Sequence, residues 1–208
     1  MRSADAIAAG VAMLRDPHLA QLARRRPLPK GMTLLLEVAS GETEALAAAC
    51  SMTGRSEATV QKAAGFFIEQ VLLNRQGDYY RVLGLSRDAL PMELRRHMAL
   101  MMKWLHPDLF SAPAEGMNFS RSAYVGLVTE AWETLKTRER RAAYDAVLTQ
   151  EKRISWHGGL NGGGVLPGKT ELELRALPSR SAGRRLALHR IERGGFWSRL
   201  KSYIGIFG

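Results

Sequence analysis

Two apolar stripes at helical spacing, one on each side of residue 107, most constrain how this 208-residue chain can fold. The stripes are Leu94, Met98, Met101 and Leu105, then Val125, Val128, Trp132 and Leu135. Steps of three and four residues place the members of a stripe on one side of an α-helix. Pro91 suits the first turn of a helix that Pro107 ends. We therefore predict helices over about 91–105 and 119–135, paired as an antiparallel hairpin in an all-α fold.

The first 77 residues have the pattern of short helices separated by breakers. The predicted helices cover residues 4–15, 32–39, 43–52 and 56–76. The last is the longest, with an apolar stripe through Val60, Ala64, Phe67 and Val71 and with Gly77 as its stop. Amphipathic helices of this length bury their apolar sides against one another, so we predict a small N-terminal helical bundle.

Several function classes are disfavoured by composition. One cysteine, Cys50, allows neither an intrachain disulfide framework nor a four-thiolate zinc site. The histidines are scattered without ligand spacing, and no run is long and apolar enough to span a bilayer. Residues 163–170 match the bare P-loop expression, but no preceding strand or α/β pattern supports a nucleotide site. We predict no catalytic residue, no metal and no cofactor, and a cytoplasmic protein.

Positive charge is concentrated at the C-terminal end. The whole chain has a formal net charge of +10, and residues 149–208 hold 11 Lys or Arg against 4 Asp or Glu. A glycine-rich segment at 156–164 lies in this part and has the composition of a flexible linker. A basic tail favours contact with an anionic surface, either lipid or nucleic acid. The alternative is a solvated end that keeps the protein in solution.

The last residues carry an aromatic amphipathic pattern. On a helix, one side would hold the members of the candidate docking surface: Phe196, Trp197, Leu200, Tyr203 and Phe207. Together with the basic approach before it, this pattern predicts docking on a partner or at the inner membrane surface. The alternative is that the segment covers the chain's own helices, or is too short to form a stable helix.

Three sequence marks in order identify a known module. They are Asp78-Tyr79-Tyr80-Arg81-Val82-Leu83-Gly84-Leu85, then His106-Pro107-Asp108, then Arg140-Arg141-Ala142-Ala143-Tyr144-Asp145. Residues 78–148 resemble the J domain of DnaJ-type co-chaperones, a family that binds a DnaK-type ATPase chaperone and drives its ATP hydrolysis. The resemblance implies that Tyr79, Leu83, Leu85 and Tyr144 pack the domain, and that the tripeptide contacts the chaperone.

The resemblance also assigns basic residues of the helix before the tripeptide to the chaperone contact, here Arg95, Arg96 and Lys103. Arg96 and Lys103 are seven residues apart and nearly aligned. Where the family usually has two further basic residues, this chain has Ala99 and Leu100. The loss of charge predicts slower and less salt-dependent encounter. Leu100 and Trp104 form an apolar pair, which we interpret as an adapted contact.

The resulting division of the chain is an N-terminal helical region (1–77), a J domain (78–148), a linker region (149–194) and an amphipathic segment (195–208). We predict a co-chaperone that recruits a DnaK-type ATPase, with flanking regions setting its location or an unspecified client. The alternative is a helical adaptor whose J-like hairpin is degenerate and whose Arg-rich tail binds membrane or nucleic acid.

Overall fold

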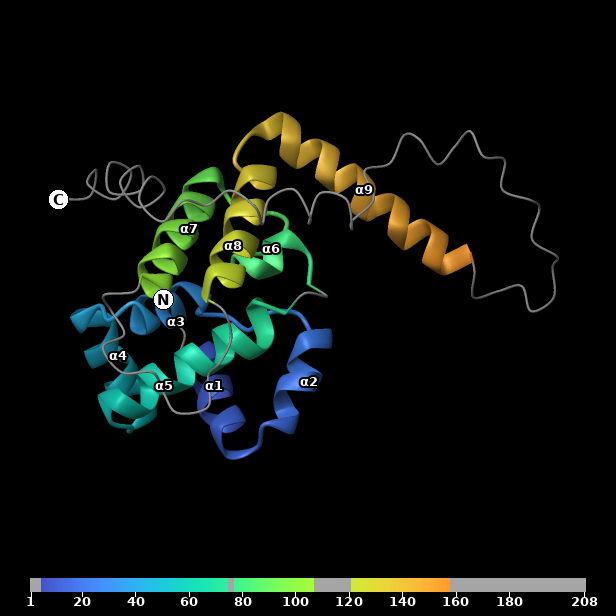
Figure 1. The fold of residues 1–208 in the computed structure, drawn as a ribbon. Helices are drawn as coiled ribbons and strands as arrows, with labels where there is room; N and C mark the ends of the chain where they lie inside the picture. Colours follow the sequence, from blue (N-terminus) through green and yellow to red (C-terminus); the bar gives the residue numbers. More distant parts are fainter. Residues whose placement is uncertain (1–4, 75–76, 107–120, 158–208) are drawn as a thin grey trace. The chain divides into compact units, whose positions relative to one another are not determined.

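The computed structural model describes residues 5–74, 77–106 and 121–157, and the regular elements in these ranges are all helical (Figure 1). The predicted all-α fold is therefore confirmed for this part of the chain. Contacts divide the chain into two units, Met1–Tyr144 and Asp145–Gly208. Within the described residues, the second unit is the later part of one helix, α9 (Arg138–His157). None of the described helices has the length and apolar composition needed to cross a bilayer.

Five helices and a π-helical turn, η1, form the N-terminal bundle. They are α1 (Asp5–Arg15), α2 (His18–Arg25), α3 (Met32–Ala39), α4 (Thr43–Thr53), α5 (Glu57–Phe67) and η1 (Ile68–Leu72). α5 is central, because α1, α3 and α4 all pack against it (Figure 1). Leu35, Val60 and Phe67 are fully buried in this core. The predicted helical bundle is thus present in the described residues.

The end of α5 departs from the predicted regular helix to Gln76. In η1 the N–H of Leu73 donates to the carbonyl oxygen of Ile68, five residues earlier, over 2.9 Å. Ile68, Val71 and Leu72 of this turn are all buried, at the spacing that a regular apolar stripe also has. The prediction that Gly77 stops this helix was wrong, since the helical residues end at Leu72.

The predicted hairpin consists of α7 (Pro91–Leu105) and α8 (Arg121–Leu135), which lie side by side (Figure 1). A short helix, α6 (Tyr79–Val82), packs on α8. Arg141, in the first turn of α9, which follows α8 after two residues, donates to the carbonyl oxygen of Ala89, just before the start of α7. This bond confirms that the two helices are antiparallel.

The apolar stripe of α7 is buried as predicted, but that of α8 differs at one position. Val125, Val128 and Leu135 are buried, whereas Trp132 is half-buried and Ala131 takes the fully buried place. Ala131 follows Val128 by three residues and precedes Leu135 by four, so it keeps the same helical spacing. The small side chain allows α8 to approach its neighbours closely.

Gly84 lies where the J segment meets the N-terminal bundle. Its φ of +68° is in the left-handed region that glycine adopts without strain. A Cβ at this position would lie 3.3 Å from Met32, 3.4 Å from Leu72 and 3.6 Å from the Nδ1 of His97. α3 also packs on α7, and both belong to the same compact unit. The predicted domain boundary at residue 77 therefore stays a prediction, and the two regions on either side of it are tightly packed together.

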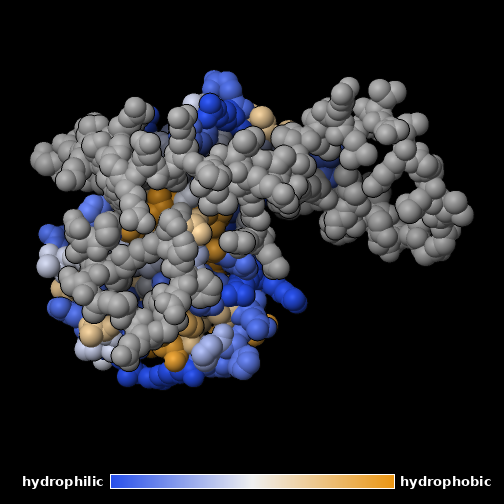
Figure 2. Space-filling model, in the orientation of Figure 1, coloured by the Kyte–Doolittle hydropathy of each residue, from blue (hydrophilic) through white to orange (hydrophobic). Residues whose placement is uncertain are grey.

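Polar residues dominate the visible described surface. Figure 2 shows hydrophilic residues around its outer edge, with smaller hydrophobic areas between them. Among the described residues, the exposed large apolar side chains are Leu22, Met52, Leu90, Met92 and Val147. Apart from Leu90 and Met92, which flank Pro91, they lie on separate helices and are of the scattered kind common on protein surfaces.

We expect Gly84→Ala to lower the free energy of unfolding by more than the ~1–2 kcal/mol that a left-handed alanine costs. Gly54→Ala is a matched control, because Gly54 has a φ of +63° but no atom within 4 Å of the added Cβ. Urea denaturation of both variants measures the difference. Equal losses would contradict the tight contact at Gly84.

Candidate functional site

α7 ends at the first residue of the His-Pro-Asp tripeptide. His106 caps the helix with extended backbone (φ −66°, ψ 133°), and its N–H donates to the carbonyl oxygen of Lys103 over 3.1 Å. A proline disfavours helical backbone at the residue before it, so Pro107 explains why the helix ends here. Pro107 and Asp108 lie outside the described residues. The half-buried His106 is thus the member of the tripeptide that the structure places.

The start of α7 is fixed by local signals. Pro91 occupies its first turn, where the missing N–H costs no hydrogen bond. The Oε2 of Glu93 accepts from the N–H of Leu90 over 2.8 Å, which satisfies a donor at the helix end. The predicted bounds of α7 are therefore confirmed at both ends.

The three predicted basic residues occupy two positions around α7. Arg96 forms an ion pair with Glu37 of α3, and the Nζ of Lys103 lies 2.8 Å from the Oε1 of Glu42, which precedes α4. Arg95 lies about 100° further round the helix and is exposed. Among the described residues it makes no hydrogen bond or ion pair. The structure brings Arg96 and Lys103 together with carboxylates of the N-terminal bundle and leaves Arg95 to solvent.

Leu100 and Trp104 do not form an exposed apolar contact. They are 8% and 5% exposed, and the indole ring of Trp104 lies beside Gly65 of α5. Our interpretation of this pair as an adapted chaperone contact was therefore wrong. The pair is apolar because it forms a second buried face of α7, next to the face that packs on α8.

His97 is the residue of this face that sequence reasoning missed. It is 2% exposed, and its Nδ1 lies 2.8 Å from the carbonyl oxygen of Leu83. Since a carbonyl only accepts, Nδ1 carries the proton. Nε2 then accepts from the hydroxyl of Thr33 in α3 at 2.9 Å. The spacing of His97, Leu100 and Trp104, by three and four residues, is the signal that could have revealed this second stripe.

Burial lowers the pKa of His97 below the ordinary histidine value. The carbonyl of Leu83 and the carboxylate of Glu93 act in the opposite direction, and Arg96 acts with burial. The neutral ring fits both of its hydrogen bonds. His97 therefore joins the J segment to the N-terminal bundle in its uncharged form.

A group of aromatic and arginine side chains fastens the start of α9 to α6. The rings of Tyr79 and Tyr144 stack with centroids 4.9 Å apart, and the hydroxyl of Tyr144 accepts from the N–H of Tyr79. Arg141 donates to the hydroxyl of Tyr80 and to the carbonyl oxygens of Arg87 and Ala89. Leu83 and Leu85 are buried as well. The packing roles predicted for the first and third sequence marks are confirmed.

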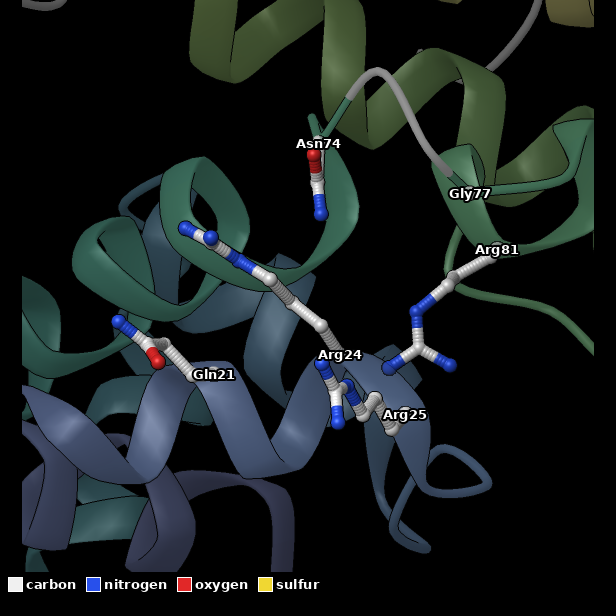
Figure 3. Close-up of a pocket in the computed structure, with 6 residues that line it drawn as sticks. All are labelled: Gln21, Arg24, Arg25, Asn74, Gly77 and Arg81. Atoms are coloured by element: carbon white, nitrogen blue, oxygen red, sulfur yellow. The ribbon is translucent and has the colours of Figure 1, made fainter.

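A basic pocket of about 360 Å³ lies between α2 and the start of α6 (Figure 3). It is lined by Gln21, Arg24, Arg25, Asn74, Gly77 and Arg81. Two of its arginines bind the protein itself: Arg81 donates to the carbonyl oxygens of Ala23 and Arg26, and Arg24 to Gln70. Burial lowers the pKa of Arg81, against the effect of Asp78. These bonds satisfy carbonyls at the end of α2 and brace the junction.

Two further predictions concern other parts of the chain. Among the described residues, no group of three His, Cys, Asp or Glu side chains could hold a metal ion. The candidate docking residues Phe196, Trp197, Leu200, Tyr203 and Phe207 lie outside the described residues, as does the glycine-rich segment from residue 158 on. Their roles stay predictions. The predicted start of that linker at Trp156 was wrong, because residues 156 and 157 end α9.

Residues 78–145 match the family described as the DnaJ domain. A curved DNA-binding protein of Coxiella burnetii is 35% identical over 97 residues, covering 43% of this chain and 29% of that protein. Chaperone protein DnaJ of Latilactobacillus sakei is 38% identical over 86 residues (41% and 19% covered). That of Geobacillus thermodenitrificans is 34% identical over 87 residues (42% and 21%). The chain spans less than a third of each relative, and no solved structure gave a significant match.

The helical hairpin, its fastening to α6 and α9, and the family match agree in extent. Residues 78–145 of this chain are a J domain, of the kind found in DnaJ-type co-chaperones. This domain is packed against an N-terminal bundle through α7 and Gly84. The candidate site is the part of α7 that remains exposed, together with His106, which caps it.

Acid should destabilise the protein through His97. The folded state keeps the ring neutral, so the unfolded state binds more protons as the pH falls below about 6.5. The free energy of unfolding should therefore be fully retained above this pH and decrease below it, by at most ~1.4 kcal/mol per pH unit. Urea denaturation between pH 7.5 and pH 5 measures this slope.

His97→Gln should weaken that pH dependence, whereas His18→Gln, at an exposed histidine, should preserve it. An unchanged slope in His97→Gln would show that other groups cause the acid sensitivity. The comparison uses slopes, so a lower starting stability of either variant does not affect it.

Arg141→Met should lower the free energy of unfolding by about 2 kcal/mol, because it leaves two backbone carbonyls and the hydroxyl of Tyr80 without their charged donor. Arg140→Met is the control, since Arg140 is exposed and pairs with the exposed Glu133. Thermal or urea denaturation gives both values. Equal effects would argue against a fastening role for Arg141.

Proposed function

We propose that this chain is a co-chaperone that binds a DnaK-type ATPase chaperone and stimulates its ATP hydrolysis. The observation that carries the proposal is the DnaJ-domain match over residues 78–145, in which α7 ends at His106 of the His-Pro-Asp tripeptide. The chain itself catalyses nothing in this proposal. It acts by binding energy, which changes the state of the partner's active site.

Each member of the tripeptide has a defined chemical task in this proposal. Asp108 supplies a carboxylate that accepts from an arginine fork of the partner, and Pro107 stiffens the turn. His106 presents a ring that can donate and accept hydrogen bonds. Its place as the capping residue of α7 supports this role, because the helix fixes the position of its backbone.

Arg95 carries the positive charge that first meets the chaperone. It is exposed and makes no ion pair among the described residues, so its charge is available to an approaching acidic surface. Arg96 and Lys103 belong to the same contact but are shared with Glu37 and Glu42. Charges of this kind mainly raise the rate of association and its salt dependence.

The regions outside the J domain set the client or the location. The N-terminal bundle braces α7, and the basic tail with its aromatic segment would bring the protein to a membrane surface or to nucleic acid. If the tail binds a membrane surface, the protein is cytoplasmic and peripheral at the inner membrane. The alternative adaptor function rests on the tail alone and gains no support from the described residues.

The direct test is the steady-state ATPase rate of a DnaK-type chaperone with increasing amounts of the full chain. We expect a saturable increase with the parent protein. His106→Gln should lose at least about tenfold in stimulation, as expected for a central contact residue. Absence of any increase with the parent would refute the co-chaperone function.

Arg95→Ala should raise the concentration needed for half-maximal stimulation and reduce its salt dependence, because it removes a charge from the contact face. Arg55→Ala is a matched control, since Arg55 is also exposed but lies in the turn before α5. If both variants behave like the parent, the contact does not involve this edge of α7.

A further inference from the structure

The N-terminal bundle places two carboxylates on the basic face of α7. Glu37 lies at the end of α3, and Glu42 follows it before α4. They pair with Arg96 and Lys103, one helical heptad apart, so the α3–α4 corner follows the line of positive charge along the helix. We name Glu37 and Glu42 the acidic corner.

An acidic chaperone surface would need the same two cations. We propose that the acidic corner is an internal competitor for the chaperone, which occupies Arg96 and Lys103 and lowers the affinity of α7 for its partner. This inference rests on the proposed co-chaperone function. It names the regulation of that site by another part of the same chain.

The competition acts through the ion pairs, while the apolar junction stays closed. Leu100 and Trp104 are buried, Trp104 beside Gly65 of α5, and His97 is hydrogen-bonded to Leu83 and Thr33. Opening these contacts would expose a large apolar area. The bundle therefore remains in place when the chaperone binds.

The ion pairs themselves can exchange partners. The side chains of Lys103 and Glu42 are 41% and 44% exposed, and that of Arg96 is 58% exposed. Pairs at such positions contribute little net stability, because water and salt screen them. A chaperone carboxylate can replace Glu42 at Lys103 without unfolding the junction. Glu37, at 9% side-chain exposure, holds Arg96 more firmly.

The acidic corner changes which positive charges of α7 are available to the chaperone. Arg95, on the other edge of the exposed face, needs no exchange of partners, whereas Lys103 and Arg96 become available only when the acidic corner releases them. The ion pairs thus make binding selective for the charge of the partner. A partner surface with several carboxylates displaces the acidic corner from Arg96 and Lys103, and a surface with few carboxylates does not.

Glu42→Gln tests the inference, because it removes the competing charge while keeping the size of an exposed side chain. The concentration of the full chain that gives half-maximal ATPase stimulation should fall about two- to fivefold, with an unchanged maximal rate. Glu44→Gln is a matched control: it makes the same change of charge two residues away, at a side chain that makes no ion pair among the described residues. It should leave the half-maximal concentration unchanged.

Glu37→Gln should act in the same direction, and the double variant should show the larger decrease. Circular dichroism spectra and melting temperatures of all variants establish that the fold is retained. The inference is overturned if the parent stimulates the ATPase but neither Glu42→Gln nor the double variant binds more tightly, or if Glu44→Gln has the same effect. Unchanged half-maximal concentrations would mean that the two ion pairs only stabilise the junction and do not compete with the chaperone.

The two proposals fail in different ways. If the parent stimulates the ATPase and the double variant needs a lower concentration for half-maximal stimulation, both proposals are supported. If neither stimulates, the proposed function fails and the inference with it. In each case His106→Gln in the double variant shows whether stimulation passes through the tripeptide.

Discussion

α7 is buried on two neighbouring faces, and the rest of the described structure depends on that double burial. One face, through Leu94 and Met101, packs in the hairpin with α8, and the other, through His97 and Trp104, packs on the N-terminal bundle. His97 is decisive, because its two ring nitrogens join Leu83 on one side to Thr33 on the other. A charged or longer side chain would disrupt both contacts.

Local signals made the hairpin predictable from the sequence. Pro91 and Pro107 bracket α7, and its first apolar stripe has regular spacing, so the predicted bounds matched. The second face was missed because it contains a histidine and because its partners are distant in the chain; Thr33 precedes His97 by 64 residues. The π-helical turn after α5 was missed because its buried residues keep the spacing of a regular helix, so the sequence pattern carries no sign of the wider turn.

Only part of the candidate site could be predicted from the sequence, because the remaining part depends on residues that are distant in the chain. The resemblance to the J-domain family assigned Arg95, Arg96 and Lys103 to the contact, and helical spacing aligned Arg96 with Lys103. The sequence could not show that Glu37 and Glu42 take two of them, since ion pairs between distant segments leave no periodic trace. Leu100 stands at one of the two positions where the family usually has a basic residue; it is buried, and an unpaired charge there would be costly.

The central claim is that the N-terminal bundle and the J domain hairpin form one cooperative unit joined at α7. Native-state hydrogen exchange at increasing denaturant tests this most directly. We predict that the slowest amides of α3, α5 and α7 exchange through a common opening, with the same free energy and the same denaturant dependence. Protection that persists in α7 and α8 after α3 and α5 have become exchangeable would contradict the claim.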